Sequence, residues 1–132
     1  ATTSIAVTYQ SSADASAYAA QVVALVNQER VNAGLSELSV SSGLSTGAMI
    51  RAEELVTSFS HARPDGSSWT TVSSEASGEN IAKGQANPTS VMSSWMNSSG
   101  HKANILNSNF TKIGVGVYYD NGTYYWVQLF GY

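Results

Sequence analysis

The strongest constraint on the fold lies near the end of the chain, where the hydrophobic pattern has the two-residue period of a β-strand. Apolar residues at 113, 115, 117 and 119 alternate with Gly114 and Gly116, and the segment "TYYWVQLF" follows after "DNG". Asp or Asn followed by Gly is a strong signal for a two-residue hairpin turn, because the central residues of that turn need positive φ. The sequence therefore predicts an antiparallel hairpin over residues 113–130. Glycines inside a strand also indicate that another backbone packs closely against that face.

Helical periodicity occupies the region before the hairpin. A first helix is expected from Ser16 to a stop at Gly34, with a stripe made by Ala19, Val22, Val23 and Val26. A second is expected over residues 42–59, with Arg51, Glu53 and Glu54 turned partly outward. Its predicted buried face consists of Ala48, Ala52, Leu55, Val56 and Phe59.

A third helix has a clear opening signal, with Asn87 as the cap and Pro88 at the first helical position. Its predicted end is Gly100, and its buried stripe is Val91, Met92, Trp95 and Met96. Helices followed by an antiparallel hairpin are typical of an α+β fold. We expect residues 1–15 to form an extended N-terminal arm, with "SIAVTY" as a short strand, and residues 16–132 to form one domain.

Composition excludes several classes of protein. The net charge is −3, and the six basic residues are spread singly along the chain, which argues against nucleic-acid binding. No apolar run approaches the roughly 20 residues of a transmembrane helix. The chain begins at Ala1, which fits a cleaved export signal or a trimmed chain, and low charge with much Ser and Thr is common in exported proteins. We therefore expect an extracellular, secreted protein, and a monomer.

The residues that could carry chemistry are few. The chain has no cysteine and only two histidines, His61 in "FSHARPDG" and His101 in "SSGHKANIL". Glu79 precedes the apolar "NIA", where a buried carboxylate needs hydrogen-bond donors or a cation. Two imidazoles and a carboxylate could bind Zn²⁺ with an open position for water, or act as a general acid and base. Each histidine could equally serve only to satisfy a turn, and spacing alone does not decide between these possibilities.

Other side chains have simpler interpretations. Arg63 and Asp65 are expected to be turn residues with solvated ends, and Lys102 a charge at a helix end. The aromatic residues could bind a carbohydrate or a lipid ring, but aromatic side chains in strands and on helix faces more often belong to the core. These residues are Trp69, Trp95, Trp126 and the tyrosines of "YYDNGTYYW".

Five sequence blocks, taken in order, resemble the CAP superfamily, which groups cysteine-rich secretory, antigen 5 and pathogenesis-related 1 proteins and whose domain is also called SCP. The blocks are "FSHARPDG", "GENIA", "SWMNSSGHKANIL", "FTKIGVGVYY" and "YWVQLFG", with "VNQERVNAGLSEL" before them. The likeness covers residues 20–132 and is greatest to the bacterial, cysteine-free branch. It implies an α-β-α sandwich with a small antiparallel sheet between helical layers.

The resemblance also implies a site. Family members have a central cleft, which in eukaryotic proteins holds two histidines and two glutamates and can bind a divalent cation. His61 and His101 match the two histidines, and Glu79 matches the first glutamate. The second glutamate is replaced by Ser98, which is a poor metal ligand, so binding is expected to be weaker. The expected metal ligands are His61, Glu79 and His101, with Zn²⁺ as the first candidate, and Ser98 and Asn80 are expected to line the cleft.

Three functions remain open on this basis. The first is a secreted binding module whose cleft holds a divalent cation and takes a small hydrophobic or polar ligand, a lipid or sterol, or an extracellular protein partner. The second is a hydrolase that uses a metal or the His and Glu side chains, with Glu79 as base; no other catalytic residue is assigned. The third is a structural extracellular domain whose cleft is vestigial.

Overall fold

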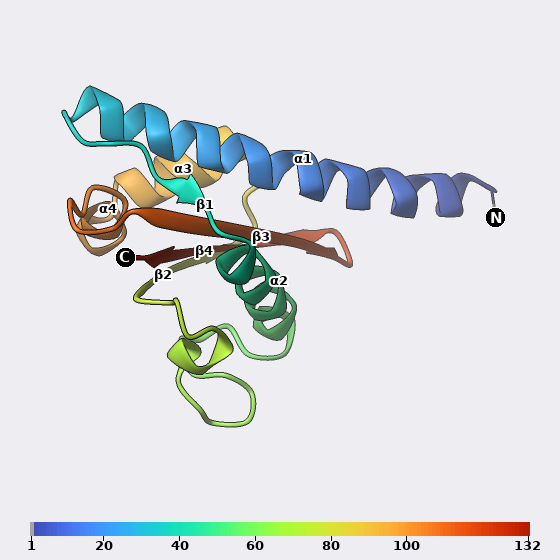
Figure 1. Ribbon diagram of the computed structural model, residues 1–132. Helices are drawn as coiled ribbons and strands as arrows, with labels where there is room; N and C mark the ends of the chain where they lie inside the picture. The colour runs from blue at the N-terminus through green and yellow to red at the C-terminus, as the bar shows by residue number, and fades with distance from the viewer. Residues whose placement is uncertain (1) are drawn as a thin grey trace.

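Helices lie on both faces of a four-stranded sheet (Figure 1). The computed structural model describes the backbone of residues 2–132 and the side chains of residues 14–132. The elements are α1 (Thr2–Asn32), β1 (Ser39–Val40), α2 (Ser42–Thr57), the 3-10 helix η1 (Trp69–Val72), β2 (Gly78–Lys83), α3 (Pro88–Met96), α4 (Ser99–Ile105), β3 (Lys112–Asp120) and β4 (Thr123–Gly131). This arrangement confirms the predicted α+β sandwich.

The sheet has the strand order β1-β3-β4-β2. Strands β3 and β4 form the predicted antiparallel hairpin, and β2 pairs with β4 in the antiparallel sheet that the family resemblance implied. The two-residue β1 pairs with β3 in parallel. The turn between β3 and β4 has positive φ at Asn121 (48°) and Gly122 (84°), as the "DNG" signal requires. Strand β2 pairs only with β4 and so forms one edge of the sheet. Glu79 and Asn80 both lie on this edge strand.

Two hydrophobic clusters fill the space between the layers. Helices α1, α3 and α4 pack on one face of the sheet, around Trp95, Trp126 and Phe130. Helix α2 packs on the other face. A Cβ atom at Gly114 would meet the backbone of Leu44, and one at Gly116 would meet the backbone of Ala48, which confirms the predicted close approach. The expectation that Trp95 and Trp126 belong to the core is also confirmed, since both are almost fully buried.

The extended arm predicted for residues 1–15 is wrong where the structure describes that segment. Helix α1 begins at Thr2, and the short strand predicted at "SIAVTY" is helical. The sequence contains neither Gly nor Pro between Ala1 and Gly34, so nothing in it interrupts the helix. Gly34, with φ of 82°, follows the end of α1 as predicted. Within the described residues, no helix has the length and apolar content needed to span a membrane.

The third predicted helix is divided into two. Asn87 caps α3 through its side chain, which accepts from the Ser90 N–H at 2.9 Å, as the sequence indicated. The helix ends at Met96, however, and Gly100 lies inside α4 rather than at a helix end. The second predicted helix ends at Thr57, two residues early, and Val56 and Phe59 are exposed. The buried stripe of α2 instead includes Arg51, which was expected to face partly outward.

Candidate functional site

A buried ion pair joins β2 to α2. Glu79 lies in β2 on the face covered by α2, and its side chain is fully shielded from solvent, as is that of Arg51. Arg51 donates from Nε to Glu79 Oε2 at 2.7 Å and from Nη2 to Oε1 at 3.2 Å. The predicted need of Glu79 for a cation is thus met by Arg51. Burial alone would lower the pKa of Arg51, but the hydrogen bonds and charge of Glu79, and then those of Glu54, outweigh it and raise the pKa.

His61 completes this group from the loop after α2. Its Nδ1 lies 2.7 Å from Glu79 Oε1, while the side chain is 56% exposed. Nε2 is therefore the ring nitrogen left for an outside partner. Arg51 Nη2 also donates to the carbonyl of Ser60 at 2.6 Å, so the same guanidinium holds the residue before His61.

The loop that carries His61 is closed by its own hydrogen bonds. The Trp69 N–H donates to the His61 carbonyl at 3.0 Å, and Ala62 forms an isolated antiparallel bridge with Ser68. The prediction that Arg63 has a solvated end is wrong, because its guanidinium forms bonds of 2.8–3.1 Å with both oxygens of Glu54. Burial would raise the pKa of Glu54, but hydrogen bonds from Arg63 and then Arg51 hold it below its usual value.

Asn80 connects β2 to α4 on the opposite face of the sheet. Its Nδ2 donates to the His101 carbonyl at 3.1 Å and to Gln128 Oε1 at 2.9 Å, and its Oδ1 accepts from Asn104 at 2.9 Å. Asn80 is fully buried. It therefore lies behind the site and anchors the backbone of His101, where we expected a side chain lining the cleft.

His101 and His61 are held by neighbouring residues of the edge strand β2, on opposite faces of the sheet: His61 by Glu79, and the backbone of His101 by Asn80. His101 is partly buried in α4. Burial, and then the charge of His61, lower the pKa of His101, so its imidazole favours the neutral form more than a free histidine does. Ser98 is the residue before α4 and is partly buried, and its side chain makes no capping bond.

Whether this arrangement can hold a metal depends on Glu79. Both of its oxygens are bonded to Arg51, and Oε1 also lies against His61, so the carboxylate does not fit the role of a free ligand. No group of three or more His, Cys, Asp or Glu side chains among the described residues is arranged to hold a metal ion. The two imidazoles fit only part of a Zn²⁺ ligand set. The zinc site therefore stays a prediction.

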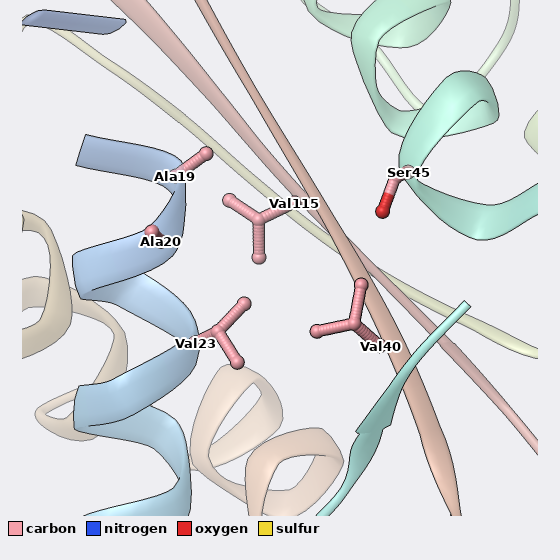
Figure 2. A pocket seen from close by; sticks show the side chains of 6 residues that line it. All are labelled: Ala19, Ala20, Val23, Val40, Ser45 and Val115. Carbon is pink, nitrogen blue, oxygen red and sulfur yellow. The ribbon is translucent and has the colours of Figure 1, made fainter. Parts of the chain in front are cut away.

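Two open apolar grooves lie elsewhere. One, of about 260 Å³, lies between α1 and α2 at the β1 edge of the sheet, and Figure 2 shows Val23, Val40 and Val115 pointing into it together with Ser45. The other, of about 300 Å³, lies between α1 and α3 and is lined by Leu25, Glu29, Thr89, Met92, Ser93 and Met96. Neither groove is lined by His61, Glu79 or His101.

Comparison with known proteins identifies the family. Residues 23–130 match CAP, the cysteine-rich secretory protein family. The chain belongs to the CAP family. This CAP domain is 43% identical over 123 residues to the uncharacterized protein YkwD of Bacillus subtilis, and the match covers 87% of the chain and 47% of YkwD. It is 31% identical over 105 residues to the uncharacterized membrane protein YlbC of the same organism, covering 74% of the chain and 30% of YlbC. The chain thus spans less than half the length of these relatives.

Solved structures agree with the fold. An extracellular protein with an SCP domain from Bacillus anthracis superposes with a TM-score of 0.80 at 27% identity, covering 88% of this chain and 40% of that one. An outer surface protein from Borrelia burgdorferi gives a TM-score of 0.70 at 20% identity, covering 83% and 87% of the two chains, and supports the fold alone.

Sequence reasoning missed three residues of this CAP site: Arg51, Glu54 and Asn104. A signal for Arg51 was present, since it follows Ala48 by three residues and precedes Leu55 by four, the spacing of a buried helical stripe. A buried arginine needs hydrogen-bond acceptors, and a carboxylate supplies both acceptors and the opposite charge. The lone carboxylate expected in the core at Glu79 was the obvious candidate.

Proposed function

We propose that this CAP domain is an extracellular binding module whose site offers the imidazoles of His61 and His101, with Glu79 as an orienting group. One observation carries the proposal: the carboxylate of Glu79 is bonded to Arg51 and to His61 Nδ1, which leaves Nε2 of this exposed side chain as the ring nitrogen that can meet a ligand. A ligand-facing imidazole whose other nitrogen is held by a carboxylate is a common arrangement in binding sites. The extracellular setting is supported by the description of the Bacillus anthracis relative.

The first ligand group to consider is a divalent cation. Imidazole nitrogens are common Zn²⁺ ligands, and the lowered pKa of His101 keeps that ring neutral and able to coordinate. Glu79 would act on His61 in this arrangement rather than on the metal. A polar ligand with a hydrogen-bond donor could use the same two rings.

The hydrolase alternative has less support from the geometry. A general base must accept a proton, whereas Glu79 is bonded to a buried guanidinium that stabilises the charged carboxylate. A hydrophobic ligand is an independent possibility. It would have to bind in a groove such as that of Figure 2, at the sheet edge opposite β2.

Calorimetric titration with Zn²⁺ tests the proposed site. The titration is run near pH 7.5, about one unit above the ordinary pKa of histidine. We expect one-to-one binding to the wild type that is lost in His61→Ala and in His101→Ala. Lys102→Ala, next to His101 but exposed, is the control and should bind as the wild type does. Binding that survives in both histidine variants, or its absence from the wild type, would contradict a zinc site at these rings.

A further inference from the structure

The guanidinium of Arg51 contacts Glu79, Glu54 and the residue before His61. Nε and Nη2 donate to Glu79, Nη2 donates to the Ser60 carbonyl, and Nη1 donates to Glu54 Oε1 at 3.0 Å. The side chain of Arg51 is fully buried. All three nitrogens are therefore used, in directions that a lysine ammonium, a single point of charge, could not reproduce.

This arrangement dictates where the proton of His61 lies. A carboxylate can only accept hydrogen bonds, and Glu79 Oε1 is 2.7 Å from His61 Nδ1. The Nδ1 atom must therefore carry the proton, and in the neutral ring Nε2 carries the lone pair. Free histidine prefers the opposite tautomer, so the preference must be imposed by the position of Glu79. Arg51 holds that position.

Glu54 and Arg63 hold the loop of His61 on the side that follows His61 in the chain. Glu54 contacts Arg51 within α2 and contacts Arg63, two residues after His61. Arg63 Nη1 donates further to Thr71 Oγ1 at 3.1 Å. His61 is thus flanked by Ser60, bonded to Arg51, and by Arg63, bonded to Glu54.

We propose that Arg51 is the positioning residue of this site: it holds Glu79 and the loop of His61 so that the ring is fixed as the Nδ1–H tautomer with Nε2 presented to the ligand. Glu54 and Arg63 assist by holding Arg51 and the loop. The ligand atom that meets the neutral ring is therefore a cation or a hydrogen-bond donor, and not an acceptor such as a carboxylate. This last statement rests on the proposed function, whereas the tautomer does not.

The tautomer can be read directly from the ring nitrogens of ¹⁵N-histidine-labelled protein by two-bond ¹H–¹⁵N correlation NMR, at a pH where both rings are neutral. The chain has two histidines, so a His101→Gln spectrum assigns the signals. For wild-type His61 we expect a protonated Nδ1 and a bare Nε2. A predominantly Nε2-protonated ring would overturn the proposal without any variant. Because no ligand is present, a failure to bind zinc would count against the proposed function and leave this result unaffected.

Variants test the role of Arg51. Arg51→Lys keeps the positive charge but loses the planar set of guanidinium donors. The share of the Nε2–H tautomer at His61 should therefore rise several-fold. A wild-type pattern in a folded variant would overturn the proposal. Arg30→Lys is the matched control. Arg30 is a buried arginine on the α1 face that bonds the carbonyls of Ser36, Ile105 and Asn107, so its loss should lower stability and leave the His61 pattern unchanged.

If Arg51→Lys does not fold, Glu54→Gln takes its place. The Glu54 side chain is 17% exposed, and its replacement by an isosteric amide weakens the hold on Arg51 and Arg63 without leaving an unpaired buried carboxylate. The Nε2–H share should again rise. An unchanged spectrum in Glu54→Gln would overturn the proposal that this network fixes the tautomer.

Discussion

Arg51→Met is expected to be among the most damaging single substitutions in the domain. Methionine fills similar space but removes the cation that compensates Glu79, a side chain with no exposure. Removing one partner of a buried ion pair costs about 3–5 kcal/mol, because the other charge stays buried. A small domain is stabilised by only about 5–15 kcal/mol in total. At roughly 4 °C per kcal/mol for a chain of this size, the midpoint should fall by about 12–20 °C.

Urea unfolding followed by tryptophan fluorescence measures this cost, and a double variant separates its causes. Arg51→Met with Glu79→Met leaves neither charge buried. It should therefore be more stable than Arg51→Met alone, although it has lost more hydrogen bonds. A cost for Arg51→Met below about 1 kcal/mol, the level of an exposed pair, would refute the reasoning. So would a double variant whose cost equals the sum of the two single costs.

Three further predictions follow from the packing and the charges. Gly116→Ala should lower the free energy of unfolding by roughly 1–3 kcal/mol, because the added Cβ meets the backbone of Ala48. Urea unfolding measures this loss. In the control Gly100→Ala, whose added Cβ has no neighbour within 4 Å, no loss is expected. The lowered pKa of His101 means that the unfolded chain binds a proton more readily, so stability should fall as the pH drops below 6.5, the ordinary value. In His101→Gln that acid loss should be smaller in thermal melts recorded above and below this pH, and an equal loss would contradict the assignment. Asn80→Ala leaves Gln128 Oε1 without its donor and should cost about 1–3 kcal/mol in urea unfolding; a cost near zero would show that the buried amide network contributes nothing to stability.

The sequence predicted those elements whose causes are local. The hairpin follows from alternation and the "DNG" turn, and α3 from Asn87 and Pro88. Helix α4 was not predicted, because glycine often marks the end of a helix and Gly100 follows the predicted third helix. In the structure Gly100 lies instead in the first turn of α4. The start of α1 was predicted wrongly because "SIAVTY" has a strand-like composition. In the structure this segment forms the N-terminal part of the same long helix, α1.

The site was predictable only in part, because its geometry is tertiary. The burial of Glu79 and its need for a cation could be inferred from the apolar residues that follow it, and the structure bears both out. The identity of that cation required knowing that α2 covers the same face of β2. The neighbourhood of His61 and Glu79 came from the resemblance to the CAP family, and residue types alone left it open. The expectation that Asn80 lines the cleft is wrong because successive residues of β2 point to opposite faces, so Asn80 lies on the face opposite Glu79.

In the proposed site, His61 meets its ligand through Nε2 while Glu79 retains Nδ1. Zinc titration of the ¹⁵N-histidine-labelled protein, followed at the ring nitrogens, distinguishes the two nitrogens of His61. We expect a saturable change at the Nε2 signal of His61 and at one nitrogen of His101, with His61 Nδ1 still protonated at the end of the titration. A saturable change centred on His61 Nδ1, or rings that do not respond to zinc at all, would contradict it.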